Sequence, residues 1–346
     1  MLKNIHRWLP GYLARSKPRD AISHVFFCFV DHFEPLWNKV SRHQGLERVE
    51  HWFENYPRMA EKFRDADGRA PQHTIFYPAE DYLPEYLDLL ARLCGQGYGE
   101  VEIHLHHDRD TAENLKSHIE SFKQKLESHG FLSNHRYGFI HGNWSLDNSR
   151  SDGRWCGVNN ELQVLRETGC YADFTLPSAP SDTQTRKINS IYYATDDPLR
   201  PKSHDTGIDV RVGGKAEGDL LLVQGPLALN WRSRKFGLIP RIENGDVARY
   251  SPATPDRIDL WVRQRIGVVG RPDWVFVKVH THGCQERNFR AVLDDRLHEA
   301  LQRLPYKLHY VTARELYNLV KAAEAGQQGD PNQLRDFLLP PPPVRR

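Results

Sequence analysis

Long apolar segments are missing from this chain of 346 residues. A membrane-spanning helix needs about 18 or more consecutive apolar residues, and no such run occurs. Residues 1–20 carry basic side chains and Trp8 but no continuous apolar stretch, so they do not resemble a secretory signal. The sequence therefore predicts a protein without a membrane partner.

Cysteine is scarce and scattered. The five cysteines form no C-x-x-C pair, and their wide spacing and odd number are typical of reduced thiols, which indicates a cytoplasmic protein. Each is expected to be a small buried apolar residue. The five are Cys28, Cys94, Cys156, Cys170 and Cys284.

A concentrated charge of one sign is also missing. The 47 basic and 45 acidic residues give a net charge of +2, and the basic residues are spread along the chain. A nucleic-acid surface needs a clustered basic face, so a nucleic-acid partner is not expected. No composition break or repeat divides the chain, and residues 1–346 are predicted to form one large domain. The sequence gives no indication of oligomeric state.

What the sequence does contain is an alternation of strand and helix patterns. Strands are expected at 24–30, 74–77, 101–106, 137–141 and 172–176, with helices at 46–63, 83–94, 111–129 and 160–168 between them. The pattern returns with helices at 256–266, 293–304 and 313–323 and strands at 274–280 and 307–310. Repeated βα units predict parallel strands in a barrel or doubly wound sheet, with ligands at the C-terminal strand ends.

Two regions depart from this alternation. Residues 178–250 hold short β-like runs, at 188–194, 208–212 and 220–223, punctuated by glycine and proline. We expect them to form a β-rich elaboration of the main fold. Residues 339–346 contain four consecutive prolines and are expected to be an extended tail.

Histidine is abundant, with 18 residues, and it gathers with aspartate where the predicted strands end. A lone histidine at a strand end is ordinarily a satisfied core or surface residue, but four strand ends with the same feature indicate a shared site. Histidine suits both metal binding and proton transfer near neutral pH. The residues concerned are Asp31, His32, His104, His106, His107, Asp110, His141, His280 and His282.

Strand alternation predicts where these side chains point. In 101–106 the aliphatic residues share one face, and Glu102, His104 and His106 share the other. In 274–280 Lys278 and His280 oppose the valines in the same way. Polar groups that face the interior are costly unless they are paired, hydrogen-bonded or bound to metal. We therefore expect one connected polar network inside the fold.

The spacing of His106 and Asp110 favours a metal. A ligand at a strand end and another four residues later, near a helix start, can converge on one ion. Imidazole and carboxylate suit a divalent metal, with Zn favoured and Mn, Fe or Co as alternatives. No cysteine belongs to this group, so a structural zinc site is not expected.

These segments resemble the polysaccharide deacetylase (NodB-homology) superfamily, an irregular (β/α)7 barrel. The family's first strand ends in two aspartates, the first a general base and the second a metal ligand. The resemblance implies Asp31 as the base and His32 as a ligand. Residues 102–106 match the strand before the family's H-x-x-x-H motif, with His106 and Asp110 in the two ligand positions.

The family's last motif is an aliphatic strand that ends in Leu-x-His, and this histidine is the catalytic acid. Residues 278–280 match it with lysine in place of leucine, which implies His280 as the acid. The family's Arg-Pro motif is absent, and residues 141–144 occupy its place. The resemblance covers residues 25–174 and 274–317, and none of its motifs is intact.

The leading hypothesis is a metal-dependent hydrolase that acts on a carbohydrate amide or ester. Asp31 would accept the proton of water and His280 would protonate the leaving group, with Asp31 as an alternative direct ligand. Two alternatives stay open: a glycoside hydrolase of a related barrel family, with carboxylates among Asp31, Glu34, Asp108 and Asp110, and a degenerate barrel that binds a glycan or a partner protein. Residues expected to shape the substrate pocket are His104, His141, Asn143, Trp144 and His282.

Overall fold

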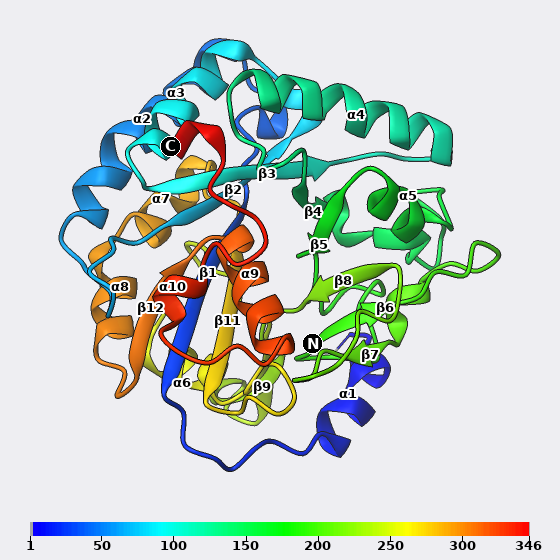
Figure 1. Cartoon of the computed structure of the whole chain (residues 1–346), viewed down its shortest axis with the longest axis vertical. Coiled ribbons are helices and arrows are strands. Elements are labelled where there is room, and N and C mark those ends of the chain that lie inside the picture. Colours follow the sequence, from blue (N-terminus) through cyan, green and yellow to red (C-terminus); the bar gives the residue numbers. More distant parts are fainter. Residues whose placement is uncertain (1–2, 346) are drawn as a thin grey trace.

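The protein is built around one ten-stranded sheet, seen here in a computed structural model that describes residues 3–345. The strand order is β11-β1-β2-β3-β4-β5-β8-β6-β7, with β12 also paired to β1 (Figure 1). The strands are β1 His24–His32, β2 His73–Pro78, β3 Gly99–Leu105, β4 Tyr137–His141, β5 Cys170–Asp173, β6 Ile191–Ala194, β7 Ile208–Asp209, β8 Leu220–Val223, β11 Trp274–Thr281 and β12 Lys307–Val311.

The helices follow most strands in the order that βα units require. Several begin at a side-chain cap: Thr111 accepts from the Asn114 amide, and Thr312 and Glu315 form a reciprocal capping box. They are α1 Ile5–Ala14, α2 Arg42–Ala60, α3 Pro84–Gly95, α4 Ala112–Ser128, α5 Glu161–Glu167, α6 Pro255–Val262, α7 Glu286–Val292, α8 Asp295–Gln302, α9 Ala313–Glu324 and α10 Pro331–Leu334.

Strand β1 organises the centre of the sheet. One edge pairs along its length with β11, and the other pairs with β12 at residues 24–28 and with β2 at residues 30–32. The strands from β11 through β5 run parallel, so their C-terminal ends lie at the same edge. This edge is where parallel α/β proteins bind their ligands.

Each face of the sheet has its own apolar core. Phe27 and Phe29 of β1 face one core with Trp52 of α2, and helices α2, α3 and α4 lie outside the sheet (Figure 1). Phe26 and Val30 face the other core, where Leu316 of α9 packs within the curve of the sheet. In β3 and β11 the aliphatic residues meet the outer core, as strand alternation predicts.

The expected α/β fold is confirmed, although the sheet does not close into a barrel. Within residues 3–345 no strand pairing joins β11 to β5 or β8. Instead, the buried Lys278 ammonium donates to the carbonyl oxygens of Phe174 and Leu176. Residues 245–247 also run beside β11. The His280 amide donates to the Gly245 carbonyl oxygen, and the Val247 amide donates to the His280 carbonyl oxygen. Side-chain and loop hydrogen bonds therefore cross the open seam, which is the gap between β11 and the segment after β5 where no strands pair.

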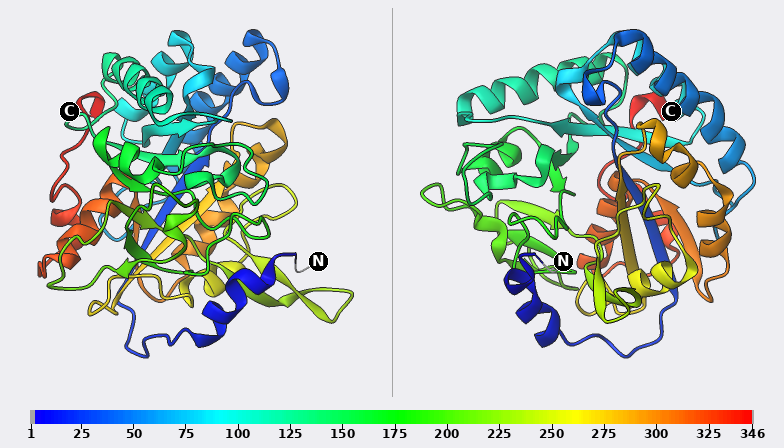
Figure 2. Two further views of the ribbon diagram at one scale, coloured as in Figure 1. Left: turned by 90° about the vertical axis from the view of Figure 1, so that its right-hand side faces the viewer. Right: turned by 180° about the vertical axis from the view of Figure 1, so that it is seen from behind.

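The β-rich elaboration at 178–250 has two parts. Strands β6, β7 and β8 extend the main sheet, and β9 Ala228–Lys235 and β10 Ile239–Glu243 form a separate hairpin that projects from the body (Figure 2). This hairpin was not predicted, because its residues alternate in exposure without an apolar pattern. Helices α1 and α7 were not predicted either.

The C-terminal segment is packed rather than free. Leu339 is buried, residues 343–345 form a short turn, and the Arg345 guanidinium lies 2.8 Å from Glu100 Oε1. Extended backbone was the expectation for this tail, and the contact with Glu100 explains the difference. None of the helices described has both the length and the apolar character that crossing a membrane requires.

Candidate active site

A histidine-rich pocket opens at the C-terminal ends of β1, β3 and β11. Its volume is about 460 Å³. Trp37 and Tyr250 at its margin are 38% and 77% exposed, so aromatic surface is available to a ligand. The lining residues are His32, Glu34, Leu36, Trp37, Pro78, Glu80, Asp81, His106, Asn143, Trp144, Tyr250, His282, Gln285 and Arg287.

Glu34 lies at the centre of the histidines. Its Oε1 is 3.5 Å from His104 Nε2 and 3.4 Å from His106 Nε2. Its Oε2 is 3.2 Å from His282 Nδ1. Glu34 is the second residue after β1, on the same side as His32, so β1 brings it to the same point as the ends of β3 and β11.

Three of these side chains form a group with the donor atoms and spacing of a metal site. The ligand atoms of Glu34, His104 and His106 all lie within 4.8 Å of one another. His104 Nδ1 contacts the Ile140 carbonyl at 2.9 Å, which orients the ring. Its buried Nε2 finds no hydrogen-bond partner in residues 3–345. A polar atom of this kind is expensive unless a cation or water is bound, so the residues fit a divalent metal.

Two further imidazoles line the pocket beside this group. The His32 ring centroid is 4.9 Å from that of His104 and 4.8 Å from that of His282. Trp144 closes this side, 5.8 Å from His32 and 6.0 Å from His282. His32 thus lies beside the compact set of Glu34, His104 and His106 but does not belong to it.

The electrostatics of the pocket follow from burial and close pairing. Burial opposes ionisation of Glu34, but the close imidazoles of His104, His106 and His282 hold the pKa of its carboxyl well below the ordinary range. Burial alone would lower the pKa of His106, yet hydrogen bonds with Glu34 and Glu80 raise that pKa to about 10. Burial raises the pKa of Asp81 to about 6.

Asp31 lies outside the pocket. It is fully buried on the face of β1 that carries Phe29, with Oδ2 2.9 Å from His73 Nε2. Its Oδ1 accepts from the Gly283 amide at 2.7 Å. Because successive strand residues point to opposite faces, His32 faces the pocket and Asp31 faces helix α2. The sequence predicted that Asp31 contacts substrate or a metal, and its position in the structure corrects that prediction.

His280 also sits deeper than expected. It is 6% exposed, its ring centroid is 6.3 Å from that of His32, and it does not line the pocket. Burial, together with the charge of Lys278, lowers the pKa of His280 well below its usual value. A neutral, covered imidazole is a poor proton donor to substrate, whereas His282 lines the pocket directly.

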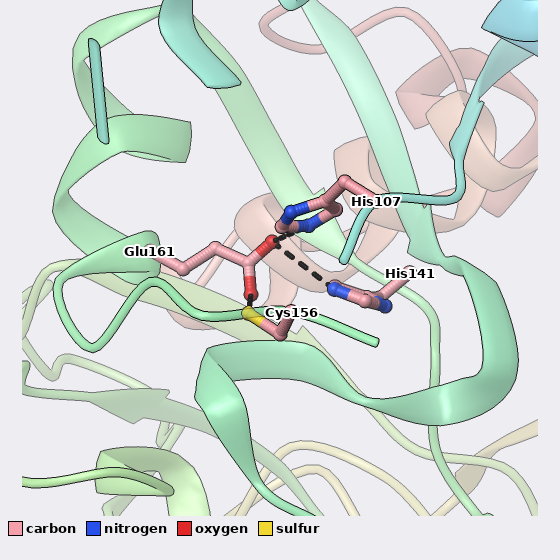
Figure 3. Close-up of side chains that lie close together, drawn as sticks. All are labelled: His107, His141, Cys156 and Glu161. Carbon is pink, nitrogen blue, oxygen red and sulfur yellow. Dashed lines mark hydrogen bonds and ion pairs between the residues drawn. The ribbon is translucent and has the colours of Figure 1, made fainter. Parts of the chain in front are cut away.

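Asp110 and His141 belong to a second cluster. Asp110 Oδ2 lies 3.2 Å from His107 Nδ1, so Asp110 does not join His32 and His106 as the spacing suggested. His141 is fully buried and does not line the pocket. Its ring meets His107, Cys156 and Glu161 instead, from four separate places in the chain (Figure 3).

Asn143 and Trp144, by contrast, line the pocket, and their contact with substrate stays a prediction. The sequence did not point to Glu80 or Glu161, and it suggested Glu34 only as one possible glycosidase carboxylate. All cysteines were predicted to be buried apolar residues. The position of Glu34 two residues after His32 was an available signal. Nothing comparable marked Cys156 or Glu161, which follow a long irregular loop.

Comparisons with known proteins give little more. No protein-family model and no curated protein matches the chain. An α-mannosidase from Enterococcus faecalis V583 aligns at 10% identity and TM-score 0.45, over 89% of this chain and 30% of that chain. TK1436, a GH57 branching enzyme from Thermococcus kodakaraensis, aligns at 11% identity and TM-score 0.41, over 83% of this chain and 69% of that one.

These two similarities concern the backbone fold alone, and no functional residue is assigned from either protein. The chain spans less than a third of the mannosidase chain. The comparisons lend no support to the polysaccharide deacetylase superfamily in particular.

Proposed function

We propose that this protein is a metal-dependent hydrolase that acts on a carbohydrate amide or ester. The observation that carries the proposal is the compact group of Glu34, His104 and His106 at an open pocket, with the buried His104 Nε2 lacking a partner among the residues described. Two imidazoles and a carboxylate with open positions toward solvent are the donor set of a catalytic zinc site.

The residues of this group would hold the ion, and His32 would stand beside it. When bound, a divalent cation at this place supplies Lewis-acid polarisation of the substrate carbonyl and lowers the pKa of water. His282 lines the pocket outside the group and contacts Glu34, and we assign proton transfer to it. Glu80 holds His106 from the opposite side of its ring, which fixes the ring as an outer-sphere carboxylate does.

The surroundings of the pocket favour an extended sugar substrate. Trp37, Trp144 and Tyr250 line the pocket, and aromatic rings are the side chains against which the flat apolar faces of sugars can stack. A cavity of about 700 Å³ beneath the β9–β10 hairpin shares Tyr250 with the pocket. A third cavity of about 310 Å³ shares Asn143 and Trp144 with it. Together they provide room for more than one sugar ring.

Metal removal and restoration test the proposal. Protein stripped with a chelator should lose release of acetate from O- or N-acetylated oligosaccharides, and added Zn²⁺, Mn²⁺ or Co²⁺ should restore it. Glu34→Gln and His104→Ala should lose metal and slow turnover by roughly 10²-fold or more, because the ion loses one of few ligands. His129→Ala, in which the altered ring contacts Asp88 far from the pocket, is the control.

A glycoside hydrolase is the second candidate, and the pocket carboxyls favour it. Glu34, Glu80 and Asp81 all line the pocket, and the raised pKa of Asp81 leaves part of that carboxyl protonated near pH 6. Glycosidic cleavage needs one carboxylic acid and one carboxylate across the scissile bond. Chelator-resistant cleavage of aryl glycosides that is lost in Asp81→Asn would favour this function over the first.

A further inference from the structure

The second cluster has the geometry of a closed metal site. The ligand atoms of His107, His141, Cys156 and Glu161 all lie within 4.8 Å of one another. Glu161 Oε1 is 3.1 Å from His107 Nε2 and 3.5 Å from His141 Nε2, and Glu161 Oε2 is 3.4 Å from Cys156 Sγ. Ligands about 2.0–2.3 Å from a tetrahedral ion are about 3.5 Å from one another, so these separations match the edges of such a shell.

Both imidazoles turn the same nitrogen toward the centre (Figure 3). His107 Nδ1 lies 3.2 Å from Asp110 Oδ2, and His141 Nδ1 lies 2.5 Å from the Gly142 carbonyl oxygen. The Gly142 contact favours a proton on Nδ1 of His141, which leaves its Nε2 free to donate a lone pair. His107 Nε2 is hydrogen-bonded to Glu161 Oε1 at 3.1 Å, and a cation between these two atoms would replace that hydrogen bond, with the proton on Nδ1 beside the Asp110 carboxylate. A carboxylate or carbonyl behind the ring is the usual support of a metal-bound histidine.

The interior of the cluster leaves one imidazole nitrogen without a hydrogen bond. His141 is completely buried, yet its Nε2 has no hydrogen-bond partner among residues 3–345, and its approach to Glu161 is a bare 3.5 Å contact. The Cys156 sulfur is surrounded differently, because it accepts from the backbone amides of Asn148 at 3.2 Å and Val158 at 3.4 Å. Burial and the nearby Glu161 carboxylate raise the pKa of the Cys156 thiol, and the two amide donors oppose part of that shift because they stabilise negative charge on the sulfur. A bound cation would oppose the rest.

From this arrangement we infer that His107, His141, Cys156 and Glu161 bind a structural Zn²⁺ ion. One thiolate, two imidazoles and one carboxylate complete a tetrahedral shell, and the thiolate favours zinc over the harder cations Mg²⁺ and Ca²⁺. All four side chains are almost completely closed off from solvent. The exposed fraction of the side chain is 4% for His107 and zero for Glu161. Such a closed shell stabilises the fold and leaves no position for substrate.

The site would tie together the wall of the active-site pocket. Its ligands come from the second residue after β3, the end of β4, the loop at 142–160 and the first turn of α5. That loop contains five non-glycine residues with φ between 50° and 67°, a conformation that side chains rarely adopt. These are Asn143, Trp144, Asp147, Asn148 and Trp155. Anchoring Cys156 and Glu161 would hold the loop that presents Asn143 and Trp144 to the pocket.

Cobalt replacement separates this site from the pocket, since only this one contains a thiolate. Chelator-stripped protein reloaded with Co²⁺ should show a near-ultraviolet thiolate-to-cobalt charge-transfer band and bind two equivalents of metal. Cys156→Ser should lose the band and one equivalent. Glu34→Gln should keep the band and lose the other equivalent, so the inference does not depend on the proposed function.

The matched control is Cys170→Ser, which alters another buried cysteine outside the cluster and should retain the band. Zn²⁺ added to stripped protein should raise the melting temperature of Cys170→Ser but raise it much less in Cys156→Ser. This comparison remains informative if Cys156→Ser is less stable. A wild-type protein without the band, or a Cys156→Ser variant that retains it, would overturn the inference.

Discussion

His106 and His107 are neighbours in the chain, yet their rings reach two different carboxylates. His106 Nε2 lies 3.4 Å from Glu34 Oε1 in the open pocket, and His107 Nε2 lies 3.1 Å from Glu161 Oε1 in the buried cluster. The alternation of side chains at the end of β3 produces this division. One dipeptide therefore contributes to both candidate metal centres.

Alanine at each position should separate the two centres. His106→Ala should lose the metal of the pocket and most hydrolytic activity, and keep the cobalt–thiolate band. His107→Ala should lose the band and melt at a lower temperature, because a structural ion contributes to folding directly. Metal content, absorption spectrum and acetate release on the same preparations provide the check. Identical metal loss in both variants would show that the two rings serve a single ion.

Asp31→Asn should weaken the fold rather than the chemistry. The carboxylate links His73 on β2 to the Gly283 amide after β11, and the amide side chain cannot replace both contacts equally. We expect the free energy of unfolding to fall by about 1–3 kcal/mol, measured in denaturant, with turnover of the folded protein nearly unchanged. If Asp31 were the general base, turnover would instead fall by roughly 10²–10⁴-fold at constant stability.

His298 should make stability depend on pH. This histidine is buried on α8 beside Tyr310, and burial lowers its pKa from 6.5 to about 3. Between these two values the unfolded chain binds a proton that the folded chain does not. The free energy of unfolding should therefore fall as pH drops below 6.5, by up to about 1.4 kcal/mol per pH unit from this group.

The variant His298→Gln removes this titration and keeps a polar group near Tyr310. Denaturant unfolding of both proteins between pH 7 and pH 4 gives the comparison, and the difference between them isolates His298 from all other groups. The stability of the variant should decline less steeply with acid. Parallel curves for the two proteins would contradict the assignment.

Lys278 should be essential to the open seam. Its ammonium donates to the carbonyl oxygens of Phe174 and Leu176. Burial lowers the pKa of Lys278 to about 7, and the nearby Asp173 carboxylate opposes part of that shift. Lys278→Met should leave two buried acceptors without a donor and cost about 2–4 kcal/mol of unfolding free energy. Lys62→Met, at a half-exposed lysine paired with Asp295, should change stability by no more than about 1 kcal/mol. Chemical denaturation of both variants measures the difference.

The sequence predicted the architecture better than it predicted the partners of individual side chains. Alternation in β3 and β11 was informative because one face of each is aliphatic and the other polar. In β1 both faces are apolar until Asp31, so periodicity could not say which of Asp31 and His32 faces the pocket. The family resemblance assigned Asp31 to chemistry, and only its contacts with His73 and Gly283 show that it lies outside the pocket.

The buried cluster was beyond sequence reasoning for a different physical reason. Cys156 and Glu161 reach His107 and His141 through an irregular loop with left-handed residues, and no periodic pattern encodes its path. A cysteine without a nearby partner in sequence reads as an apolar core residue. Contacts between distant segments were needed to reveal it.

Gly142 lies between the two candidate centres and allows their histidine rings to pack close to the backbone. A Cβ atom at this position would lie 2.2 Å from His106 Cδ2, while the Gly142 carbonyl contacts the His141 ring on the other side. The Gly142 backbone therefore lies between a ring of the open pocket and a ring of the closed cluster. Any side chain here would displace the His106 ring. Natural variation at residue 142 should be confined to glycine for the same reason.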